Sequence, residues 1–381
     1  MFWQREVLRS GVGMTFGQTY ELDLPKSGVL GSLVLYVRSN QNGYPFLTAV
    51  KWRLIDYISK IELIGDGQEV IKSFDGRQAL ACAFHDQDGL EPPGMWRHYS
   101  NTPHRQWIPI HFGRRLFDEI YGLDLSRFEQ VKLKVTNDAT STEFTTDIDI
   151  DVIAYWIREA GVAVGGYFRE EEWKTWAPAA AAVEYTDLPV ALAIRRILLR
   201  ARPAVDSADA KNNSSMHRLM SDIDFTFRTG QTRVYKGSLE TLGHLSVLEL
   251  GRFVETRGAI DRTAGYGFET GVGYVMQGLG YGAADADGIT TALANMRQDV
   301  QESAQEMGYR PANGMLSWTV RGHGYMHNVP LWVARKEDLS DLLDPEALKV
   351  VKADITCQTG TTVTGTTKNA ENAIILSRLV R

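Results

Sequence analysis

A hairpin pattern occurs twice in this chain. Residues 59–71 read SKIELIGDGQEVI, and residues 221–235 read SDIDFTFRTGQTRVY. Each segment opens with Ser-x-Ile and an acidic residue, alternates apolar and polar residues into a turn containing Gly-Gln, and leaves the turn on a second alternating run. Alternation with a period of two is typical of a half-buried strand, and two such runs around a glycine turn predict a β-hairpin. The sequence therefore predicts that the same hairpin is built twice.

The match extends upstream of the hairpins and indicates a duplication. Ile61 and Ile223 lie 162 residues apart, and the Gly-Gln pairs lie 163 apart because the second turn is one residue longer. The triplet at 23–25, Asp-Leu-Pro, has a counterpart at 187–189 at an offset of 164. At both places an alternating strand ends before a proline, which cannot donate to a sheet ladder, and a second apolar strand follows.

A short helix is predicted after each hairpin. In the first copy, Leu80 and Phe84 stand four residues apart after an Asp-Gly pair. In the second copy, apolar residues recur every three positions after Ser238, at Leu239, Leu242 and Leu245. Spacings of three and four place side chains on one face of a helix. Each copy thus reads as strand, strand, hairpin and helix.

The remaining strands give the fold class. Alternating runs predict strands at 107–112, 131–135 and 144–156 in the first copy, and at 315–320, 329–334, 351–357 and 373–380 in the second. With about eight short strands in each copy, we expect an all-β protein of two tandem eight-stranded jelly rolls, each made of two sheets closed over one core. The chain of 381 residues is also longer than one core usually supports. We expect the first roll at 1–160, an inter-roll linker at 161–182 and the second roll at 183–381.

The second copy is longer than the first, and we expect the extra residues to form an insertion at about 251–313. This segment combines glycine-rich sequence with a predicted amphipathic helix, whose apolar stripe would be Leu293, Met296, Val300 and Met307. The first copy has a shorter excursion at 85–107. In the predicted linker, the acidic run 170–172 and the tryptophans Trp173 and Trp176 favour a short ordered connector over a flexible spacer.

The charge of the chain argues against a surface that coats nucleic acid. The formal net charge is −6, whereas phosphate binding needs a surplus of Lys and Arg. The best local basic patch consists of Arg195, Arg196, Arg200 and Arg202. Because these arginines alternate with apolar residues in a predicted strand, we interpret them as a solvated or interface edge. We expect no direct sequence-specific binding of nucleic acid.

No stretch of the sequence carries a recognisable catalytic, cofactor or metal motif. The glycine-rich segment 265–282 lacks the Gly-Lys-Ser/Thr of a phosphate loop and is interpreted as an ordinary loop. Four histidines, His85, His98, His104 and His111, have spacings that fit no compact metal motif, so an exposed aromatic loop or subunit contact is favoured. Asp147, Asp149 and Asp151 share one strand face, which suits an outward sheet face better than a calcium site.

One kind of catalytic site, a pair of carboxylates, has no sequence motif. The chain has neither a Gly-x-Ser-x-Gly elbow nor a His-Glu-x-x-His pair. Carboxylate pairs of the glycosidase kind are assembled in space and leave no sequence spacing. We assign no catalytic, cofactor-binding or metal-ligating residue and expect no cofactor.

The cysteines indicate a reducing compartment, and the amino-terminal residues do not indicate secretion. Cys82 and Cys357 lie far apart without a partner at metal spacing, so buried free thiols are expected, with a disulfide between them as the lesser alternative. The first residues, MFWQREVLRSG, are not followed by the apolar stretch of a signal peptide, and no run is long enough to span a membrane. Phe2 and Trp3 beside Arg5 and Arg9 could instead suit a lipid headgroup zone, a frayed end or a protein groove.

Two consecutive jelly rolls, each with a Ser-x-Ile hairpin around Gly-Gln and a following helix, with a long insertion in one roll, resemble a known family. The pattern is similar to the double jelly-roll major capsid proteins of tailless icosahedral viruses of bacteria or archaea, over residues 17–380. The resemblance is architectural and includes no invariant fingerprint.

The resemblance implies a structural protein and no enzyme. In that family three chains form a homotrimer whose six rolls make a pseudo-hexameric capsomer of the virion shell, and the loop insertions form outward towers or seams between rolls. The implied partners are neighbouring capsomers, penton proteins and minor capsid proteins, and an internal membrane is left open. The implied localisation is the virion capsid, assembled in the host cytoplasm.

Two other classes of protein remain as alternatives because a fold does not settle a function. A carbohydrate-active or glycan-binding protein of two jelly rolls predicts a cleft lined by carboxylates and exposed aromatic residues. A spike or fibre protein predicts a slender trimer without lattice contacts.

Overall fold

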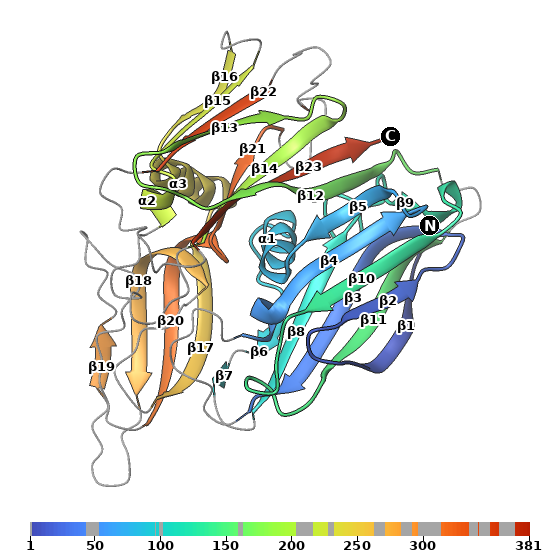
Figure 1. Ribbon diagram of the computed structural model, residues 1–381, viewed down its shortest axis with the longest axis horizontal. Coiled ribbons are helices and arrows are strands. Elements are labelled where there is room, and N and C mark those ends of the chain that lie inside the picture. Colours follow the sequence, from blue (N-terminus) through green and yellow to red (C-terminus); the bar gives the residue numbers. More distant parts are fainter. Residues whose placement is uncertain are drawn as a thin grey trace.

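A computed structural model of the chain describes residues 2–42, 53–95, 97–98, 102–158, 163–202, 216–227, 232–262, 271–282, 292–295, 314–334, 342, 351–357 and 370–381. The polypeptide is built mainly of antiparallel strands, with two helices of more than two turns, α1 (Gly76–Asp86) and α3 (Leu239–Leu250), in this described part. Figure 1 shows two strand-rich halves side by side, with α1 between them.

The first half is a jelly roll. Its eight strands are β1 (Phe2–Met14), β2 (Thr19–Asp23), β3 (Val29–Asn40), β4 (Ile58–Gly65), β5 (Glu69–Phe74), β8 (Pro103–His111), β10 (Val131–Asn137) and β11 (Ile148–Arg158). One sheet has the order β1-β11-β3-β8, extended by β6 (Gly94–Met95), with β9 (Leu123–Asp124) beside β3. The other sheet begins β2-β10-β4-β5. Counted along the roll, the first, eighth, third and sixth strands therefore face the second, seventh, fourth and fifth.

The second half repeats this order. Its strands are β12 (Tyr167–Trp176), β13 (Val183–Leu188), β14 (Ala193–Arg202), β15 (Asp222–Phe227), β16 (Thr232–Gly237), β21 (Asn328–Trp332), β22 (Val351–Thr356) and β23 (Glu371–Val380). They pair as β12-β23-β14-β21 and as β13-β22-β15-β16. Each strand occupies the same place in the order as its counterpart in the first half. The expected all-β fold of two tandem eight-stranded jelly rolls is confirmed.

Irregularities in strand pairing recur at matching places in the two rolls. The ladder skips Leu8 between β1 and β11, and it skips Trp173 between β12 and β23. It skips Gly31 in β3 and Arg195 in β14, the same third strand of each roll. Both hairpins also shift register once, between Leu63 and Ile64 in the first and at the equivalent step in the second. Because a β-bulge is a specific local feature, three shared bulges support the duplication predicted from sequence.

The predicted helices follow the two hairpins. Asp75 caps α1, accepting a hydrogen bond from the backbone N–H of Gln78 at 2.8 Å, and Ser238 caps α3, accepting from the N–H of Thr241 at 3.1 Å. Side-chain oxygens at this position satisfy N–H groups that a helix end leaves without partners. Three shorter helical segments are η1 (Leu54–Tyr57), η2 (Leu125–Arg127) and α2 (Met216–Leu219). In the described chain, no helix is long and apolar enough to cross a bilayer.

Two segments that were not predicted as strands are the first strand of each roll. The amino-terminal residues form β1, and part of the predicted linker forms β12. Strand β12 pairs antiparallel with β23 and parallel with β5, with Glu170 opposite Lys72 and Glu171 opposite Ser73. These pairings join one sheet from each roll into a continuous eight-stranded sheet, β2-β10-β4-β5-β12-β23-β14-β21. The exact division of the chain at residues 160 and 182 stays a prediction.

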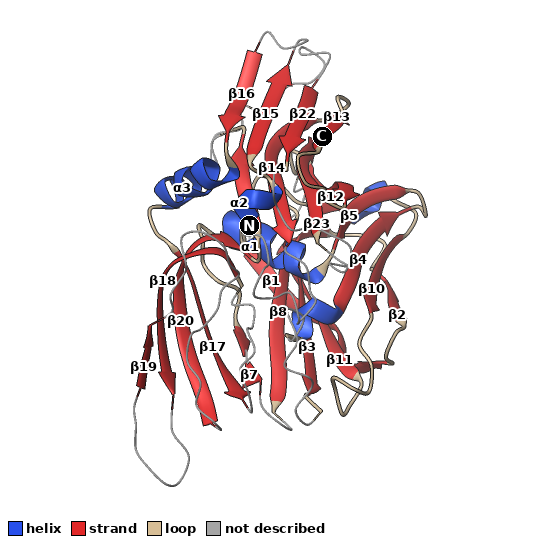
Figure 2. Ribbon diagram, turned by 60° about the vertical axis from the view of Figure 1, so that its left-hand side comes forward, coloured by secondary structure: helices blue, strands red, loops and turns tan. Residues whose placement is uncertain are grey.

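The insertion forms a separate sheet outside the two rolls. Strands β17 (Val254–Arg262), β18 (Val272–Gly282), β19 (Ala292–Asn295) and β20 (Gly314–Tyr325) form a sheet with the order β19-β18-β20-β17-β7. Strand β7 (Arg97–His98) comes from the excursion of the first roll and pairs parallel with β17. Both views place this sheet beside the first roll (Figures 1 and 2). The two predicted excursions therefore meet in one sheet.

Two predictions for the insertion were wrong in the described residues. The glycine-rich part at 272–282 is strand β18, and Leu293 lies in strand β19 where an amphipathic helix was expected. Glycine here allows close packing, because a Cβ at Gly322 of β20 would collide with the carbonyl oxygen of Tyr274 in β18. Residues 263–270 and the other members of the predicted helix stripe, Met296, Val300 and Met307, lie outside the described residues.

Replacing either hairpin isoleucine by aspartate tests the proposed strand faces. Ile61 and Ile223 are fully buried on equivalent strands. Ile61→Asp and Ile223→Asp should each lower the free energy of unfolding by roughly 4 kcal/mol or more, because an unpaired carboxylate in a core is poorly solvated. Urea unfolding followed by circular dichroism measures the effect. Lys60→Asp, at a neighbouring side chain that is 52% exposed, should change little; equal losses at 60 and 61 would contradict the assignment.

Candidate functional site

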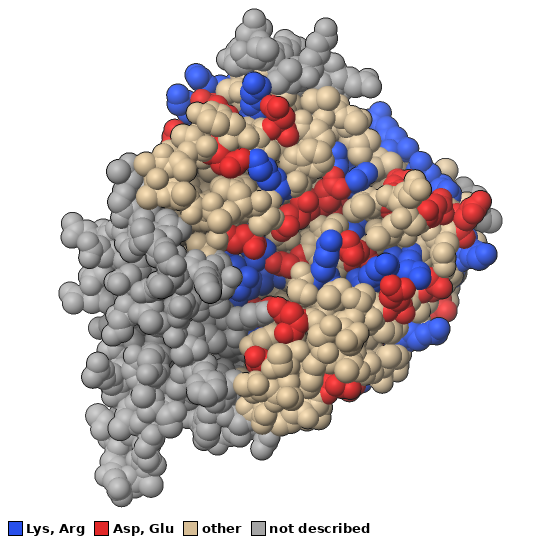
Figure 3. Space-filling view, in the orientation of Figure 1, with Lys and Arg blue, Asp and Glu red and all other residues tan. Residues whose placement is uncertain are grey.

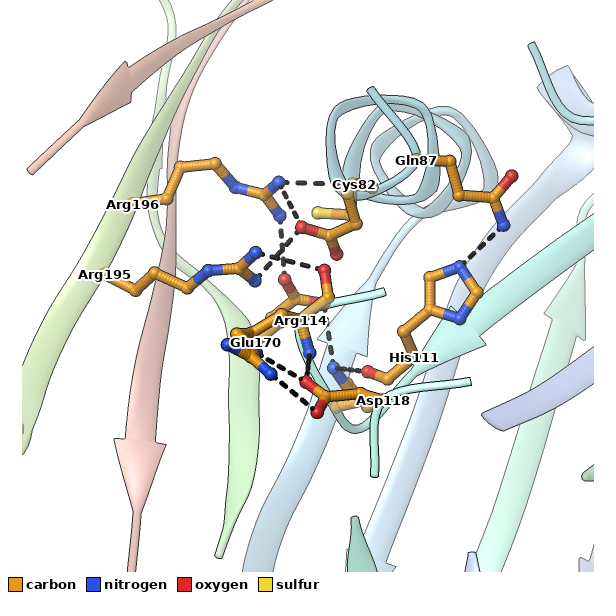
Figure 4. Close-up of polar contacts among 10 residues, drawn as sticks. Cys82, Gln87, His111, Arg114, Asp118, Glu170, Arg195 and Arg196 are labelled. Carbon is orange, nitrogen blue, oxygen red and sulfur yellow. Dashed lines mark hydrogen bonds and ion pairs between the residues drawn. The ribbon is translucent and has the colours of Figure 1, made fainter. Parts of the chain in front are cut away.

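A network of charged side chains is buried where the two rolls meet. The first roll contributes Lys72 from β5 and Asp86 from the end of α1, and the second contributes Glu170 from β12 and Arg195 and Arg196 from β14. Each of these five side chains is at most 3% exposed. Figure 4 shows the charged groups of Glu170, Arg195 and Arg196 converging beside α1.

Glu170 lies at the centre of the network. Its Oε2 accepts a hydrogen bond from Lys72 Nζ at 2.8 Å, and its Oε1 accepts one from Arg196 Nη2 at 2.8 Å. Lys72 Nζ also donates to the carbonyl oxygen of His111 at 2.6 Å. The parallel pairing of β5 with β12 places Lys72 directly opposite Glu170, so the backbone ladder and the ion pair support each other.

Asp86 binds two arginines that are consecutive in the sequence. Its Oδ1 accepts hydrogen bonds from Arg196 Nη1 at 2.8 Å and from Arg195 Nη1 at 3.1 Å. Neighbouring side chains of a regular strand point to opposite faces of the sheet. The bulge at Arg195 removes this alternation locally and lets both guanidinium groups reach one carboxylate. The Arg195 guanidinium also lies 4.7 Å from the ring centre of Phe168 and 5.2 Å from that of Trp332.

Electrostatics explains which groups of the network are ionised. Burial favours a raised pKa for Glu170, but the charges of Lys72 and Arg196 outweigh burial and hold its pKa at about 2. Burial raises the pKa of Asp86, and the Arg196 and Arg195 guanidinium groups oppose that rise. Burial, with the nearby Lys72 charge, lowers the pKa of His111 to about 3, so its ring is neutral at pH 7. Three cationic side chains thus share two carboxylates.

Further polar contacts continue along the same contact between the rolls. Arg200 of β14 donates to Asp75, the residue that caps α1, and lies 3.3 Å from Glu371 at the start of β23. Gln78 of α1 donates to Glu172 of β12. The first helix is therefore held by the second roll at both of its ends, through Asp75 and Asp86. We call the contacts of Lys72, Asp75, Asp86, Glu170, Glu172, Arg195, Arg196 and Arg200 the inter-roll seam.

The charged groups of the seam bind one another and hold the two rolls together. Both carboxylates of the network are engaged by cations, and the ring nitrogens of His111 are hydrogen bonded to Ser32 Oγ at 2.8 Å and to Gln87 Nε2 at 2.9 Å. The carboxylates and the His111 ring are therefore occupied by contacts within the protein. A buried ion network tolerates only those arrangements in which each charge keeps its partners, so the seam restricts the orientation of one roll relative to the other.

The basic cluster predicted at 195–202 belongs to this seam. Arg195, Arg196 and Arg200 are each 1% exposed. The interface interpretation is confirmed for these three residues at a contact within the chain, whereas the solvated-edge interpretation is wrong, because α1 packs against this face of β14. On the face shown in Figure 3, the described acidic and basic residues are interspersed without a continuous basic patch. Sequence reasoning missed Lys72, Asp86 and Glu170; paired arginines within an otherwise apolar strand were the available signal.

The four histidines do not form one site. His85 is buried in α1, and His104 and His111 are buried in β8, so the expected exposed loop is wrong for these three. The ring of His104 is hydrogen bonded to Gln41 Oε1 at 3.1 Å. The backbone of His98 lies in β7, and its side chain is outside the described residues. Within the described ranges, no three His, Cys, Asp or Glu side chains come together as metal ligands would.

Two of the three aspartates and both cysteines lie where the sequence placed them, whereas Asp147 precedes strand β11. Asp149 and Asp151 lie on the outer face of β11, where both contact Arg38, at 3.4 and 2.8 Å. Asp151 also accepts hydrogen bonds from Ser10 and Gly11. Cys82 and Cys357 are both buried and neither is in a disulfide, as expected. Burial raises the pKa of Cys82 above its usual value, which keeps the thiol protonated.

A pocket of about 610 Å³ opens where the first roll meets the insertion sheet. It is lined by Gly89, Leu90, Glu91, Arg252, Phe253, Glu255, Arg257 and Arg321. Glu255 lies 2.5 Å from both Arg257 and Arg321, and hydrogen bonds from these arginines lower its pKa. Burial raises the pKa of Glu91 to about 7. The pocket therefore pairs an ionised carboxylate with one that is partly protonated at neutral pH.

Comparison with known proteins identifies the fold. No protein-family model matches this sequence, and no curated protein matches it. Among solved structures, the major capsid protein P2 from bacteriophage PM2 matches with a TM-score of 0.52 and 8% identity, covering 100% of this chain and 98% of that chain.

Two further solved structures match at similar levels. The structure of Sulfolobus turreted icosahedral virus matches with a TM-score of 0.50 and 10% identity, covering 94% of this chain and 91% of that chain. The capsid of the virus PBCV-1 matches with a TM-score of 0.50 and 9% identity, covering 99% of this chain and 93% of that chain. At these identities the likeness establishes a shared fold along the whole chain.

Removing charges from the seam should have unequal effects. Glu170→Gln leaves Lys72 and Arg196 without their shared carboxylate, and we expect it to lower the free energy of unfolding by about 3–5 kcal/mol. The network has one more cation than it has carboxylates, and Arg195→Met removes that extra positive charge. Because methionine also keeps an apolar side chain near Phe168 and Trp332, this variant should lower the free energy of unfolding by less. Urea unfolding of both variants gives the comparison. A larger loss for Arg195→Met would contradict this description of the network.

The buried His111 should make the protein sensitive to acid. Its pKa is about 3 when folded and 6.5 ordinarily, so only the unfolded chain takes up its proton between these values and stability falls with falling pH. From pH 6.5 to pH 5 this costs about 2 kcal/mol, and Glu170, with a pKa of about 2 against 4.5, adds its loss only below pH 4.5. Between pH 6.5 and 5, the free energy of unfolding should fall less steeply with falling pH for His111→Gln than for the wild type. Parallel slopes would refute the assignment.

Proposed function

We propose that this chain is the major capsid protein of an icosahedral virus and that three copies form a pseudo-hexameric capsomer of the shell. The observation that carries the proposal is the full-length match to the PM2 major capsid protein P2, across both rolls and their connection. In this role the protein is structural, is not an enzyme, and is located in the virion capsid after assembly in the host cytoplasm.

The architecture suits this role physically. A trimer of a duplicated roll has six similar sides and can occupy a hexagonal position in a shell. That geometry requires the two rolls of one chain to keep a constant relative orientation. The continuous eight-stranded sheet and the inter-roll seam supply this constraint.

The proposed partners follow from the role. They are two further copies of the chain, neighbouring capsomers, and penton and minor capsid proteins, with an internal membrane as a further candidate. Direct sequence-specific binding of nucleic acid is not proposed, since the net charge is −6 and Arg195, Arg196 and Arg200 of β14 are buried.

Electron microscopy of the purified chain, and of particles that contain it, tests the proposal. We expect hexagonal capsomers with three-fold symmetry that form closed shells or hexagonal arrays. In solution, the purified protein should have the mass of three chains. A chain that remains monomeric and forms neither arrays nor shells, alone or with its virion partners, would remove the proposal.

Glycan binding is the second candidate, and the pocket at the insertion sheet favours it. The pocket combines carboxylates with separated pKa values and the exposed ring of Phe253. Such a combination suits a sugar, whose faces stack on aromatic rings and whose hydroxyl groups bind carboxylates. A glycan array with the wild type and with Glu91→Gln tests this function; hydrolysis or binding by a monomeric wild type would favour it over the capsid.

A further inference from the structure

We infer that α3 and β16 of one copy dock on the outer face of the β1-β11-β3-β8 sheet of the next copy, with β16 pairing in parallel with β1. This contact would repeat, between chains, the contact that α1 and β5 make with the second roll within one chain. The inference rests on the proposed trimer and identifies the surfaces that hold it together.

The intrachain contact shows what the second roll does to α1. Cys82, His85 and Asp86 of α1 are 3%, 1% and 6% exposed. Arg196 of the second roll lies against this helix, donating to the carbonyl oxygen of Cys82 at 3.5 Å as well as to Asp86. The side of α1 that faces the second roll is therefore fully covered.

The corresponding side of α3 is uncovered in the single chain. Aligned on their capping residues Asp75 and Ser238, the helices match Cys82, His85 and Asp86 with Leu245, Leu248 and Glu249. Leu245 is 40% and Leu248 is 76% exposed. Both views show α1 enclosed between the rolls and α3 on the outside (Figures 1 and 2). Two large apolar side chains on the equivalent helix face indicate a surface that another protein covers.

A matching difference exists on the sheets that would receive the helices. In the second roll, the outer face that meets α1 includes Arg200 and Ser377, which are 1% and 2% exposed. Their equivalents in the first roll are Tyr36 and Tyr155. Arg200 and Tyr36 each stand five positions after the bulged residue of their strand, and Ser377 and Tyr155 each pair with the residue directly after that bulge. These two tyrosines are only half-buried in the single chain. The first roll thus carries an aromatic face at the place where the second roll meets a helix.

The strand edges complete the comparison. Strands β5 and β12 pair with each other, whereas their equivalents β16 and β1 each lie at the end of a sheet in the described chain. An uncovered strand end presents unpaired backbone groups that can pair with another chain. Because β16 and β1 belong to different rolls, the contact joins unlike surfaces of successive copies.

The residues that would meet across these edges are chemically compatible. Within the chain, Glu170 lies opposite Lys72 and Glu171 lies opposite Ser73. Aligning the bulges of β1 and β12 matches Glu170 with Arg5 and Glu171 with Glu6. Aligning the two hairpins matches Lys72 with Tyr235 and Ser73 with Lys236, so the expected pairs between chains are Arg5 with Tyr235 and Glu6 with Lys236. Arg5 can therefore stack on the ring of Tyr235, and Glu6 can form an ion pair with Lys236.

A contact between unlike surfaces of successive copies can close into a ring. Heterologous contacts generate rings when their rotation closes and open filaments when it does not. If the joint between chains repeats the joint within a chain, three chains provide six equivalent joints around one axis. The same inference thus explains why α3 and the β1 sheet remain uncovered in one copy.

A charge exchange tests the strand pairing in the full chain. Lys236→Glu and Glu6→Lys should each raise the dissociation constant of the trimer at least about tenfold, and the double exchange should restore it to within about threefold of the wild type. Sedimentation and native mass spectrometry measure the trimer, and circular dichroism confirms that each variant is folded. Lys60→Glu, on a 52% exposed side chain of β4, is the matched control and should assemble normally.

An apolar substitution tests the helix contact independently. Leu248→Asp should abolish the trimer while leaving the monomer folded, because the side chain is exposed in the single chain. Tyr185→Asp, at a residue 70% exposed on β13 at the opposite end of the sheet from β16, is the control of similar exposure.

The outcomes separate this inference from the proposed function. Loss of the trimer in Leu248→Asp and in both single charge variants, with rescue by the double exchange, supports the inference. A trimeric wild type whose variants all assemble with unchanged affinity overturns the inference and leaves the capsid function standing. A wild type that forms no trimer at any concentration overturns both.

Discussion

The ion pairs of Glu170 with Lys72, and of Asp86 with Arg195 and Arg196, connect the two rolls of this protein. A carboxylate removed from water is costly unless cations are placed at hydrogen-bonding distance, and here they come from both rolls. Any rotation of one roll against the other would separate the charges. The parallel pairing of β5 with β12 acts on the same residues, so backbone and side chains constrain the same orientation.

The duplicated rolls differ most where they contact other parts of the molecule. The bulge in the third strand is common to both rolls, but it carries Gly31 in the first and Arg195 in the second. At Gly31 a Cβ would collide with the ring of Trp3, so the first roll uses the bulge to pack its own amino-terminal strand. In the second roll the same bulge directs an arginine to Asp86. One inherited backbone feature thus serves internal packing in one copy and the joint in the other.

Sequence patterns predicted the parts of the fold in which one strand face is buried and the other solvated. The hairpins, the two helices, and strands such as β10 and β11 alternate clearly and were located correctly. Strands β1 and β12 were missed because they do not alternate in this way. Most of β1 is exposed in the single chain, and β12 buries Glu170 and Glu171 against partners from other strands. The glycine-rich strand β18 was mistaken for a loop because glycine is unfavourable inside strands, whereas here β18 and β20 approach closely, as at Tyr274 and Gly322.

The sequence by itself determined that the chain contains two copies of one all-β unit, because duplication and alternation are written in the order of residues. Only the tertiary structure decided how those units are joined. The seam combines Lys72, Asp86, Glu170, Arg195 and Arg196, which lie far apart in the chain and share no spacing. Periodicity reports which face of an element is buried, whereas the choice of charge partners depends on the packing of distant elements and on the desolvation that this packing imposes.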